Sequence, residues 1–369
     1  MQASKRVTIR DVAAAAGVSH QTVSRVLNDR PDVADDTRRH VWQIIQELNY
    51  QPSAIARSLT HQRSLTLGIV TAGLQYAGPS RTLSGITKGA QELGYTLLLK
   101  ELPGFDTDNV LPLLNSLLER RVDGIVWAVP EVGNNRAWLD ALDTLPVPTI
   151  FTTMQTRPGV HVVAIDNYAG ACLATAHLLH QGYRRIAHIS GPLTWWEARQ
   201  RKAGWRDTML AAGVPESELR AHEGDWMSAS GEKAIGRLLA HDPGIDAVFA
   251  ANDQMALGVL QAACRQQIHV PEQLAVAGFD GLPEAAHYWP PLTTVYQDQH
   301  RLGCIAVREL VRAIEAARVE RAHAPAADSE PELTILYPDL IARASSGAAQ
   351  VGTGCLQPAA IPILSTEMS

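Results

Sequence analysis

Short apolar runs alternate with amphipathic stretches from Leu65 almost to the end of the chain, and this alternation restricts the fold more than any other feature. Strands alternating with helices form βαβ units and parallel sheets. The predicted strands are too many for one sheet, so we expect an α/β core in two lobes. Strands are predicted at 65–71, 96–100, 124–129, 149–153, 160–165, 185–190, 247–251, 274–278 and 293–297, with helices such as 81–93, 109–120, 168–181, 198–212 and 254–266.

Polar and aromatic residues collect just after several of these strands. Parallel sheets bind ligands outside the carboxyl ends of their strands, so each position can face a cleft between the lobes. Charged and amide groups form strong hydrogen bonds with hydroxyls, and rings can cover the apolar faces of a sugar. The set therefore predicts a sugar-binding cleft. Its members are Asp166, Arg199, Arg201, Trp226, Asn252, Asp253 and Asp280.

The first fifty residues predict two short helices joined by a tight turn. Thr8 can cap the first helix, with Asp11 favoured in its first turn. Gly17 stands where the chain must turn, because glycine takes a positive φ at low cost. Ser19 can cap the second helix, which should run to about Asn28. This arrangement is typical of a helix-turn-helix, and a third helix should follow.

The second helix carries the residues that would read DNA. A recognition helix lies in the major groove with its N-terminal residues on base edges. His20 and Gln21 hold those positions, and Arg25 follows one turn later. Thr22 and Asn28 are expected to hold phosphates instead.

Charge and cysteine content narrow the class of protein. The net charge is −6, but residues 1–63 hold nine Lys/Arg against six Asp/Glu, so the acidic excess lies in the rest of the chain. A basic head on an acidic body fits a confined DNA-binding module. The four cysteines show no paired spacing, so neither a zinc site nor a disulfide framework is expected. No cofactor motif, secretory signal or membrane span is visible, and we expect a soluble cytoplasmic protein.

The N-terminal residues carry a family resemblance. The runs T-I-R-D-V-A-x-x-A-G-V-S-x-x-T-V-S-R-V-L-N and E-L-N-Y-Q-P-S-A-I-A-R-S-L resemble the start of lactose-repressor (LacI/GalR) family transcription factors. The resemblance implies a homodimer that binds operator double-stranded DNA and responds to a small-molecule sugar. It also implies an α/β two-lobed periplasmic-binding-protein-like core, with two parallel sheets and flanking helices, behind an N-terminal all-α helix-turn-helix domain. Such a repressor would be associated with the nucleoid when bound to its operator.

The resemblance divides the chain into a DNA-binding domain, a hinge, a core and a tail. Eight helical residues are too few for a stable isolated helix, so the hinge should order only against a partner chain or DNA. There Leu59 matches the leucine that family members press into the minor groove. The expected DNA-binding set also includes Ala56 of the hinge and the capping residues Thr8 and Ser19. We expect boundaries at 1–50, 51–63, 64–345 and 346–369, with a disordered tail. The expected N-lobe is 64–164 plus 294–326, and the C-lobe is 165–293 plus 327–345.

The resemblance also assigns effector-binding residues. Arg199 takes the role of the effector-binding arginine, and Trp226 that of the sugar-stacking tryptophan. Tyr76 and Trp195 depart from the family pattern and add rings, which suggests a β-linked disaccharide such as a β-galactoside or β-glucoside. A second sugar would stack on Trp195 or Trp196, or both rings only plug the cleft. The implied effector-binding set is Tyr76, Trp195, Arg199, Trp226, Asn252, Asp280 and Gln297.

Other functions stay open on the sequence alone. A periplasmic sugar-binding protein would share the core but has no use for a helix-turn-helix. A glycosidase could use Asp166 and Asp280 as its carboxylate pair, but their spacing in sequence does not give their separation in space. A corepressor-type regulator would bind DNA with its ligand instead of without it. The resemblance implies a repressor that is not an enzyme, and Trp226 with the sugar-type polar residues favours release of DNA by sugar over corepression.

Overall fold

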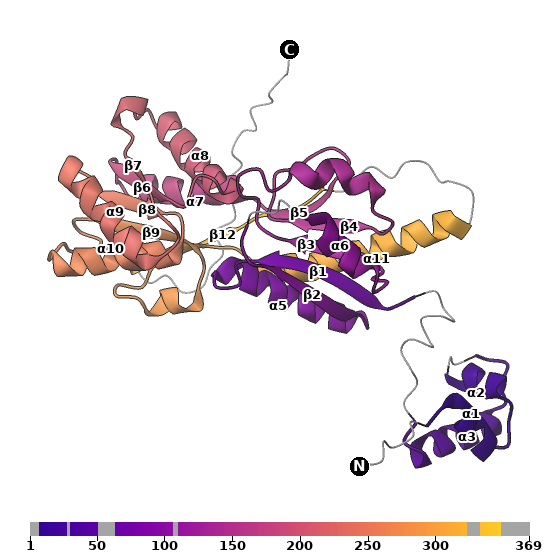
Figure 1. Cartoon of the computed structure of the whole chain (residues 1–369). Coiled ribbons are helices and arrows are strands. Elements are labelled where there is room, and N and C mark those ends of the chain that lie inside the picture. Colours follow the sequence, from indigo (N-terminus) through magenta and orange to yellow (C-terminus); the bar gives the residue numbers. More distant parts are fainter. Residues whose placement is uncertain (1–6, 28–29, 51–62, 106–109, 323–332, 348–369) are drawn as a thin grey trace.

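The computed structural model describes residues 7–27, 30–50, 63–105, 110–322 and 333–347 (Figure 1). Three sequence predictions, the phosphate contact of Asn28 and the hinge roles of Ala56 and Leu59, lie outside the described residues. The predicted disorder of the tail also lies outside them beyond Gly347.

The N-terminal domain is a three-helix unit built from local signals. The helices are α1 (Ile9–Ala15), α2 (His20–Leu27) and α3 (Asp35–Glu47). Thr8 caps α1 in a capping box, in which its backbone N–H donates to the Asp11 carboxylate over 2.8 Å. Gly17 has φ +64° in the turn, and the Ser19 hydroxyl accepts from the Thr22 backbone N–H at 3.1 Å. The caps and the turn were both predicted from the sequence.

Two six-stranded sheets form the core, one in each lobe. The N-terminal lobe has the strand order β11-β5-β4-β3-β1-β2, and its strand pairs are parallel. Helices α5 and α11 cover one face of this sheet, and α6 with the 3₁₀ helix η1 covers the other. Its elements are β1 (Thr66–Ala72), α5 (Ala77–Glu92), β2 (Thr96–Leu102), α6 (Val110–Leu118), β3 (Gly124–Ala128), η1 (Ala137–Thr144), β4 (Thr149–Thr152), β5 (His161–Ile165), α11 (Gln299–Ala322) and β11 (Leu333–Leu336).

The C-terminal lobe has the order β12-β10-β9-β8-β6-β7, with β12 antiparallel to β10. Helices α9 and α10 pack on one face and α7 and α8 on the other. Its elements are α7 (Asn167–His180), β6 (Ile186–Ser190), α8 (Trp196–Ala211), η2 (Glu216–Glu218), β7 (Ala221–Glu223), α9 (Ser228–His241), β8 (Ala247–Ala250), α10 (Asp253–Arg265), β9 (Ala275–Asp280), η3 (Pro283–His287), β10 (Thr293–Tyr296), β12 (Asp339–Ile341) and η4 (Ala344–Ser346).

The chain passes between the lobes three times within the described residues, and two of the crossings correct the predicted boundaries. The first follows β5, which ends at Ile165. The second follows β10, so 294–296 belong to the C-terminal lobe. The third falls between β11 and β12, so Leu333–Leu336 belong to the N-terminal lobe. The sequence predicted the second crossing at 294, inside β10. It predicted the third near 326, because β11 and β12 are too short to give a clear apolar pattern.

The end of the core also differs from prediction. Ser346 is buried, its hydroxyl lies 2.6 Å from that of Thr293, and it also contacts the His177 ring at 2.7 Å. The ordered core therefore extends past 345. Among the described residues no helix is long and apolar enough to cross a membrane.

Candidate functional site

A cavity of about 730 Å³, including the part open to solvent, lies between the two lobes. Strand ends and helix starts from both sheets line it, as expected for parallel sheets. Six of the seven predicted effector-binding residues are in its lining: Tyr76, Trp195, Trp226, Asn252, Asp280 and Gln297.

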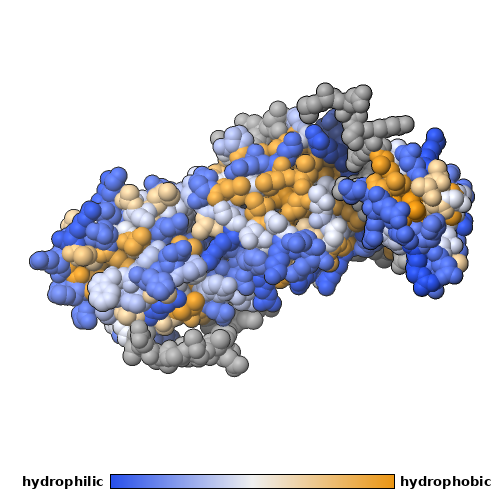
Figure 2. All heavy atoms as spheres, turned by 90° about the horizontal axis from the view of Figure 1, so that it is seen from below, coloured by the Kyte–Doolittle hydropathy of each residue, from blue (hydrophilic) through white to orange (hydrophobic). Residues whose placement is uncertain are grey.

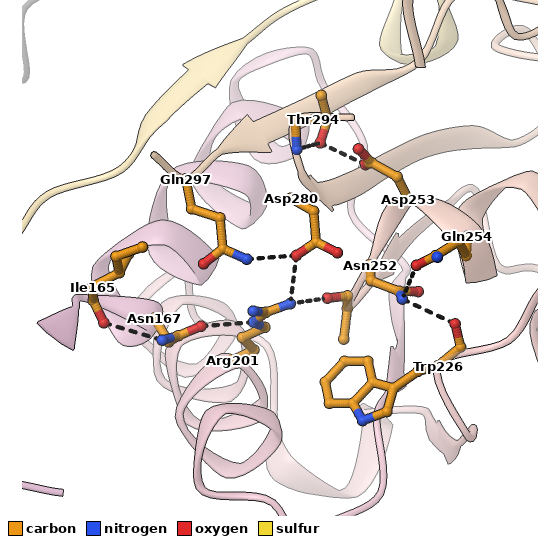
Figure 3. A network of polar contacts seen from close by, with 12 residues as sticks. Ile165, Asn167, Arg201, Trp226, Asn252, Asp253, Gln254, Asp280, Thr294 and Gln297 are labelled. Carbon is orange, nitrogen blue, oxygen red and sulfur yellow. Dashed lines mark hydrogen bonds and ion pairs between the residues drawn. The ribbon is translucent and has the colours of Figure 1, made fainter. Parts of the chain in front are cut away.

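Arg201 is the arginine of this cavity (Figure 3). Its guanidinium is buried and held on three sides: Nε donates to the Asn167 side chain at 2.8 Å, and Nη1 donates to the Ala251 carbonyl and lies 3.3 Å from the Asp280 carboxylate. The central carbon of the guanidinium, Cζ, also lies 3.8 Å from the centre of the Phe279 ring. A charged fork held by so many partners has a fixed orientation, which suits recognition of adjacent hydroxyls.

Arg199, the seventh predicted residue, is outside the cavity lining, and its assignment is corrected here. Its guanidinium is exposed and donates to the Leu193 and Thr194 carbonyls at 3.1 and 3.0 Å. Residues two apart lie about 200° apart around a helix, so Arg199 and Arg201 face opposite ways. Arg201 shares its face with the buried residues Ala198 and Trp205. The helical spacing of these buried residues is the signal that would have selected Arg201.

Asp280 is the carboxylate that Arg201 holds. Gln297 also donates to it, over 2.6 Å. Burial raises its pKa while the Arg201 guanidinium opposes that rise. Behind it, Asp253 accepts from the Leu282 backbone N–H at 2.7 Å and from the Thr294 hydroxyl at 2.6 Å. Asp253 therefore supports the loop after β9 and is not itself part of the lining.

Trp226 and Asn252 are locked to each other. The Asn252 side-chain amide donates to the Trp226 carbonyl at 2.9 Å, and its oxygen caps α10 by accepting from the Met255 N–H. Trp226 has φ +74°, a backbone conformation that L residues rarely adopt. Its ring lies over Gly191, where an added Cβ would come within 2.2 Å of the ring. A glycine is therefore required at this point for the ring to lie in the cavity wall.

Aromatic rings from both lobes meet at one end of the cavity. Trp195 packs edge-on against Trp226 with ring centres 5.7 Å apart, and against Tyr76 at 5.5 Å and Phe105 at 4.6 Å. Trp195 therefore lines the cavity and also packs against rings of the other lobe. The stacking of a second sugar on Trp195 stays a prediction. Trp196 is not in the lining. Its backbone N–H donates instead to the Glu131 carbonyl of the other lobe at 2.9 Å.

Several polar atoms of the lining have no hydrogen-bond partner among the described residues. A buried polar group without a partner costs free energy that a ligand or water can recover. Both donors and acceptors are present, so the missing partner must offer both kinds of group. The atoms are Thr152 Oγ1, Thr153 Oγ1, Glu197 Oε2, Trp226 Nε1 and Gln297 Oε1.

Sequence reasoning did not select Glu197 or Asn167. Glu197 is in the first turn of α8, and Asn167 starts α7 directly after the first crossing. Both stand next to residues that were considered, Trp196 and Asp166. A polar residue on the inward face of a helix that starts at a strand end is the signal that would have found them.

Of the two roles considered for Asp166, ligand binding and a structural contact, the structure supports the structural contact. It caps α7 by accepting from the Ala169 N–H at 2.8 Å, and it is absent from the cavity lining. Asp166 and Asp280 therefore do not form a carboxylate pair at one site. His188 is fully buried between Trp205 and Phe249, and burial lowers its pKa to about 3. Within the described part of the chain no three His, Cys, Asp or Glu side chains gather to hold a metal.

Glu197 should make the stability of the ligand-free protein depend on pH. Burial raises its pKa to about 7 from a usual 4.5. A carboxyl whose pKa is higher in the folded state adds stability at low pH, and that stability is lost as pH rises from about 4.5 to about 7. Glu197→Gln should remove this loss, worth up to about 3 kcal/mol. Urea unfolding at about pH 5 and about pH 8 measures it. Equal pH dependence in both proteins would contradict the assignment.

The predicted DNA-reading residues lie on the exposed face of α2. His20, Gln21 and Arg25 are exposed, while Val23 and Val26 on the opposite side are buried against α1 and α3. Arg25 forms an exposed ion pair with Asp32 at 3.3 Å. An exposed pair of this kind is weak, so Arg25 can exchange it for DNA at small cost.

Comparison with known proteins places both parts of the chain. Residues 8–53 match the family of bacterial regulatory proteins, lacI family, and 175–346 match the periplasmic binding protein-like domain. The ribose operon repressor of Escherichia coli (strain K12) is 36% identical over 309 residues, 83% of this chain and 93% of that protein.

Two solved structures are also similar. A Lac repressor dimer bound to operator and the anti-inducer ONPF has a TM-score of 0.80 and 31% identity, covering 93% of this chain and 100% of that one. A complex of the transcriptional regulator CelR with cellobiose has a TM-score of 0.66 and 31% identity, and covers 92% and 100%. With the helix-turn-helix and the two-lobed core in place, this chain belongs to the LacI family of bacterial transcriptional regulators.

Proposed function

We propose that this protein is a sugar-responsive repressor that binds a pseudo-palindromic operator as a homodimer. A neutral sugar in the interlobe cavity, a β-linked disaccharide by preference, draws the lobes together and releases the operator. The repressor works in the cytoplasm and associates with the nucleoid while it is bound to DNA.

The observation that carries the proposal is the set of unpartnered polar atoms beside aromatic rings. Hydroxyls both donate and accept, so a sugar supplies partners to Thr152, Glu197 and Gln297 alike. The faces of Trp195 and Trp226 offer apolar surface for the C–H groups of the rings.

The rings favour two sugar units over one. Tyr76, Trp195 and Trp226 extend the apolar lining beyond the polar network around Arg201. One unit would bond to that network and the next would lie on the rings. The solved CelR complex contains cellobiose, a disaccharide, in a relative of similar fold. The ribose operon repressor shows that the family also includes regulators of monosaccharide operons, so both sizes belong in the test.

An apolar surface on the N-terminal lobe supports the homodimer. Figure 2 shows apolar residues gathered over this lobe, and Leu65, Leu93 and Leu99 are among its exposed large side chains. A large exposed apolar patch marks a site of association. A two-fold dimer would present two recognition helices, and operator symmetry would mirror that of the protein. Leu59 of each hinge would then meet at the operator centre.

A thermal-shift panel with ribose, lactose and cellobiose tests the sugar, and fluorescence anisotropy with operator DNA tests its effect. A sugar at a hundred times its Kd should stabilise the protein by about 2.7 kcal/mol. The same sugar should weaken operator binding. If it tightens operator binding, the corepressor mode holds instead. If no sugar stabilises the protein, the proposed effector class is wrong.

His20 should choose between operator sequences. His20→Ala removes a side chain from base edges, and each good base contact discriminates by about 1–3 kcal/mol. The ranking of operator variants in an anisotropy competition should therefore change. His40→Ala, which alters an exposed histidine on α3, should leave the ranking unaltered. A uniform loss of affinity for all sequences with His20→Ala would make His20 a backbone contact.

A further inference from the structure

Two acidic residues, Asp280 and Glu197, line the interlobe cavity, and they differ in their hydrogen-bond partners. Asp280 is held by Arg201 and Gln297 at 3.3 and 2.6 Å. Glu197 is 7% exposed, and its Oε2 has no partner among the described residues. A buried carboxyl without a partner is costly to a fold that makes no use of it. This difference between the two acids indicates that the ligand itself supplies the hydrogen-bond partner of Glu197 Oε2.

The cations near Glu197 are already committed to other groups. Arg201 of the same helix donates to Asn167 and Ala251 as well as lying beside Asp280. Arg136, from the loop after β3, donates to the Asn135 side chain and to the Val129 carbonyl. Both guanidinium groups favour the charged form of Glu197 through space, and Glu131 of the facing lobe disfavours it. Neither arginine forms the missing bond, and Nε of Arg136 is itself without a partner among the described residues.

The position of Glu197 aims it at a ligand. It is the second residue of α8 and lies two residues after Trp195, whose ring lines the cavity and packs against Tyr76 of the other lobe. Acids are favoured in the first turn of a helix. The Glu197 carboxylate accepts a hydrogen bond from its own backbone, while its Oε2 has no partner among the described residues. That oxygen lies among lining atoms that lack partners, with donors and acceptors both present.

We propose that Glu197 is a specificity-determining residue of the cavity, whose carboxylate accepts a hydrogen bond from a hydroxyl of a neutral sugar and excludes sugars bearing phosphate or carboxylate groups. This inference rests on the proposed function and defines its ligand more narrowly. Arg201 is the one cation in the described lining, and Asp280 faces it, so an anionic group would find no free counter-charge. Like charges about 4 Å apart repel by about 4 kcal/mol in a partly screened site.

The test is calorimetric titration of the full-length protein with cellobiose, lactose and ribose, and with glucose 6-phosphate and glucuronate as anionic probes. The wild type should bind at least one neutral sugar and neither anion. Glu197→Gln keeps the size of the side chain but loses the charge-assisted bond, so affinity for that neutral sugar should fall about tenfold at about pH 8. Glu218→Gln, an exposed glutamate of the same lobe, is the matched control and should bind as the wild type does.

The pH profile separates ligand binding from a purely structural role. Wild-type affinity should fall between about pH 8 and about pH 6 as Glu197 takes up a proton, and the profile of Glu197→Gln should be flatter. Asp280, Glu131, Arg136 and Arg201 remain in both proteins, so the difference reports Glu197. Operator binding without sugar should be equal in both and shows that the variant folds.

Three results are distinguishable. Equal sugar affinity and equal pH profiles in wild type and Glu197→Gln would overturn the role of Glu197. Wild-type binding of glucose 6-phosphate or glucuronate as tight as that of the neutral sugars would overturn the exclusion of anions. Absence of binding by all three neutral sugars to the wild type would contradict the proposed function itself. If Glu197→Gln fails to fold, the wild-type pH profile still tests the role of Glu197, and the wild-type titrations with anions still test their exclusion.

Discussion

Arg201→Lys should abolish the release of operator by sugar while leaving operator binding in the absence of sugar intact. Lysine keeps the positive charge beside Asp280 but lacks the planar fork that reaches Asn167 and the Ala251 carbonyl together. Losing charged hydrogen bonds to a ligand costs about 3 kcal/mol, a fall in affinity of more than about 100-fold. Operator anisotropy with increasing sugar measures the result.

Arg199→Ala is the matched control, two residues away on the same helix. Its guanidinium bonds only with the Leu193 and Thr194 carbonyls on the exposed side of α8 among the described contacts. We expect a normal response to sugar. If Arg199→Ala abolishes the response and Arg201→Lys does not, the assignment of the cavity arginine is reversed. Arg201→Ala is a poorer test because it leaves Asp280 buried without its cation, which destabilises by about 3–5 kcal/mol.

Gly191→Ala should weaken sugar binding by about 30- to 100-fold, although residue 191 carries no functional group. A Cβ at this position would come within 2.2 Å of two atoms of the Trp226 ring. The ring must therefore move, and because its backbone is fixed by Asn252 it can move only by leaving the cavity wall. Overpacking costs about 1–3 kcal/mol, and the stacking surface is lost as well. Calorimetric titration measures the affinity, and tryptophan fluorescence reports the ring.

Gly236→Ala serves as the control for the loss of glycine. An added Cβ at this position in α9 has open space around it, so alanine should be neutral or slightly stabilising. If Gly191→Ala binds sugar as tightly as Gly236→Ala does, then Trp226 is not a stacking surface for the effector.

The proposed coupling between cavity and operator would act through the contacts between the two lobes. The lobes touch through the Gly133–Thr194 and Glu131–Trp196 backbone hydrogen bonds, at 2.8 and 2.9 Å, and through the rings around Trp195. A sugar that adds bonds on both sides favours the closed arrangement. Coupling energies of this kind are typically about 1–3 kcal/mol, and operator must weaken sugar binding by the same factor.

Features that depend on neighbours in sequence were predictable. The Thr8–Asp11 capping box, the turn at Gly17 and the spacing of Val23 and Val26 all act within a few residues, so the sequence alone defines α1 and α2. Nine of the twelve strands of the described core were also predicted to within a few residues at each end, because buried parallel strands read as uninterrupted apolar runs, while the short strands β7, β11 and β12 were missed. The family resemblance then indicated the two lobes.

Features that depend on the packing of distant segments were not predictable. The choice between Arg199 and Arg201 rests on which face of α8 meets β9, and that contact joins residues 79 apart in sequence. The second crossing was misplaced because the pairing of β10 with β9 decides its lobe. The third was misplaced because β11 and β12 are recognisable only by their partners, β5 and β10.

The sequence by itself determined the helix-turn-helix, the α/β class and six of the seven predicted effector-binding residues in the cavity lining, because local periodicity and strand ends encode them. Only the tertiary structure decided that Arg201 holds Asp280, that Trp195 contacts both lobes, and that Oε2 of Glu197 is buried without a partner among the described residues. Those facts depend on which faces meet when two sheets approach each other, and the periodicity of a single segment carries no information about the surface that it will meet.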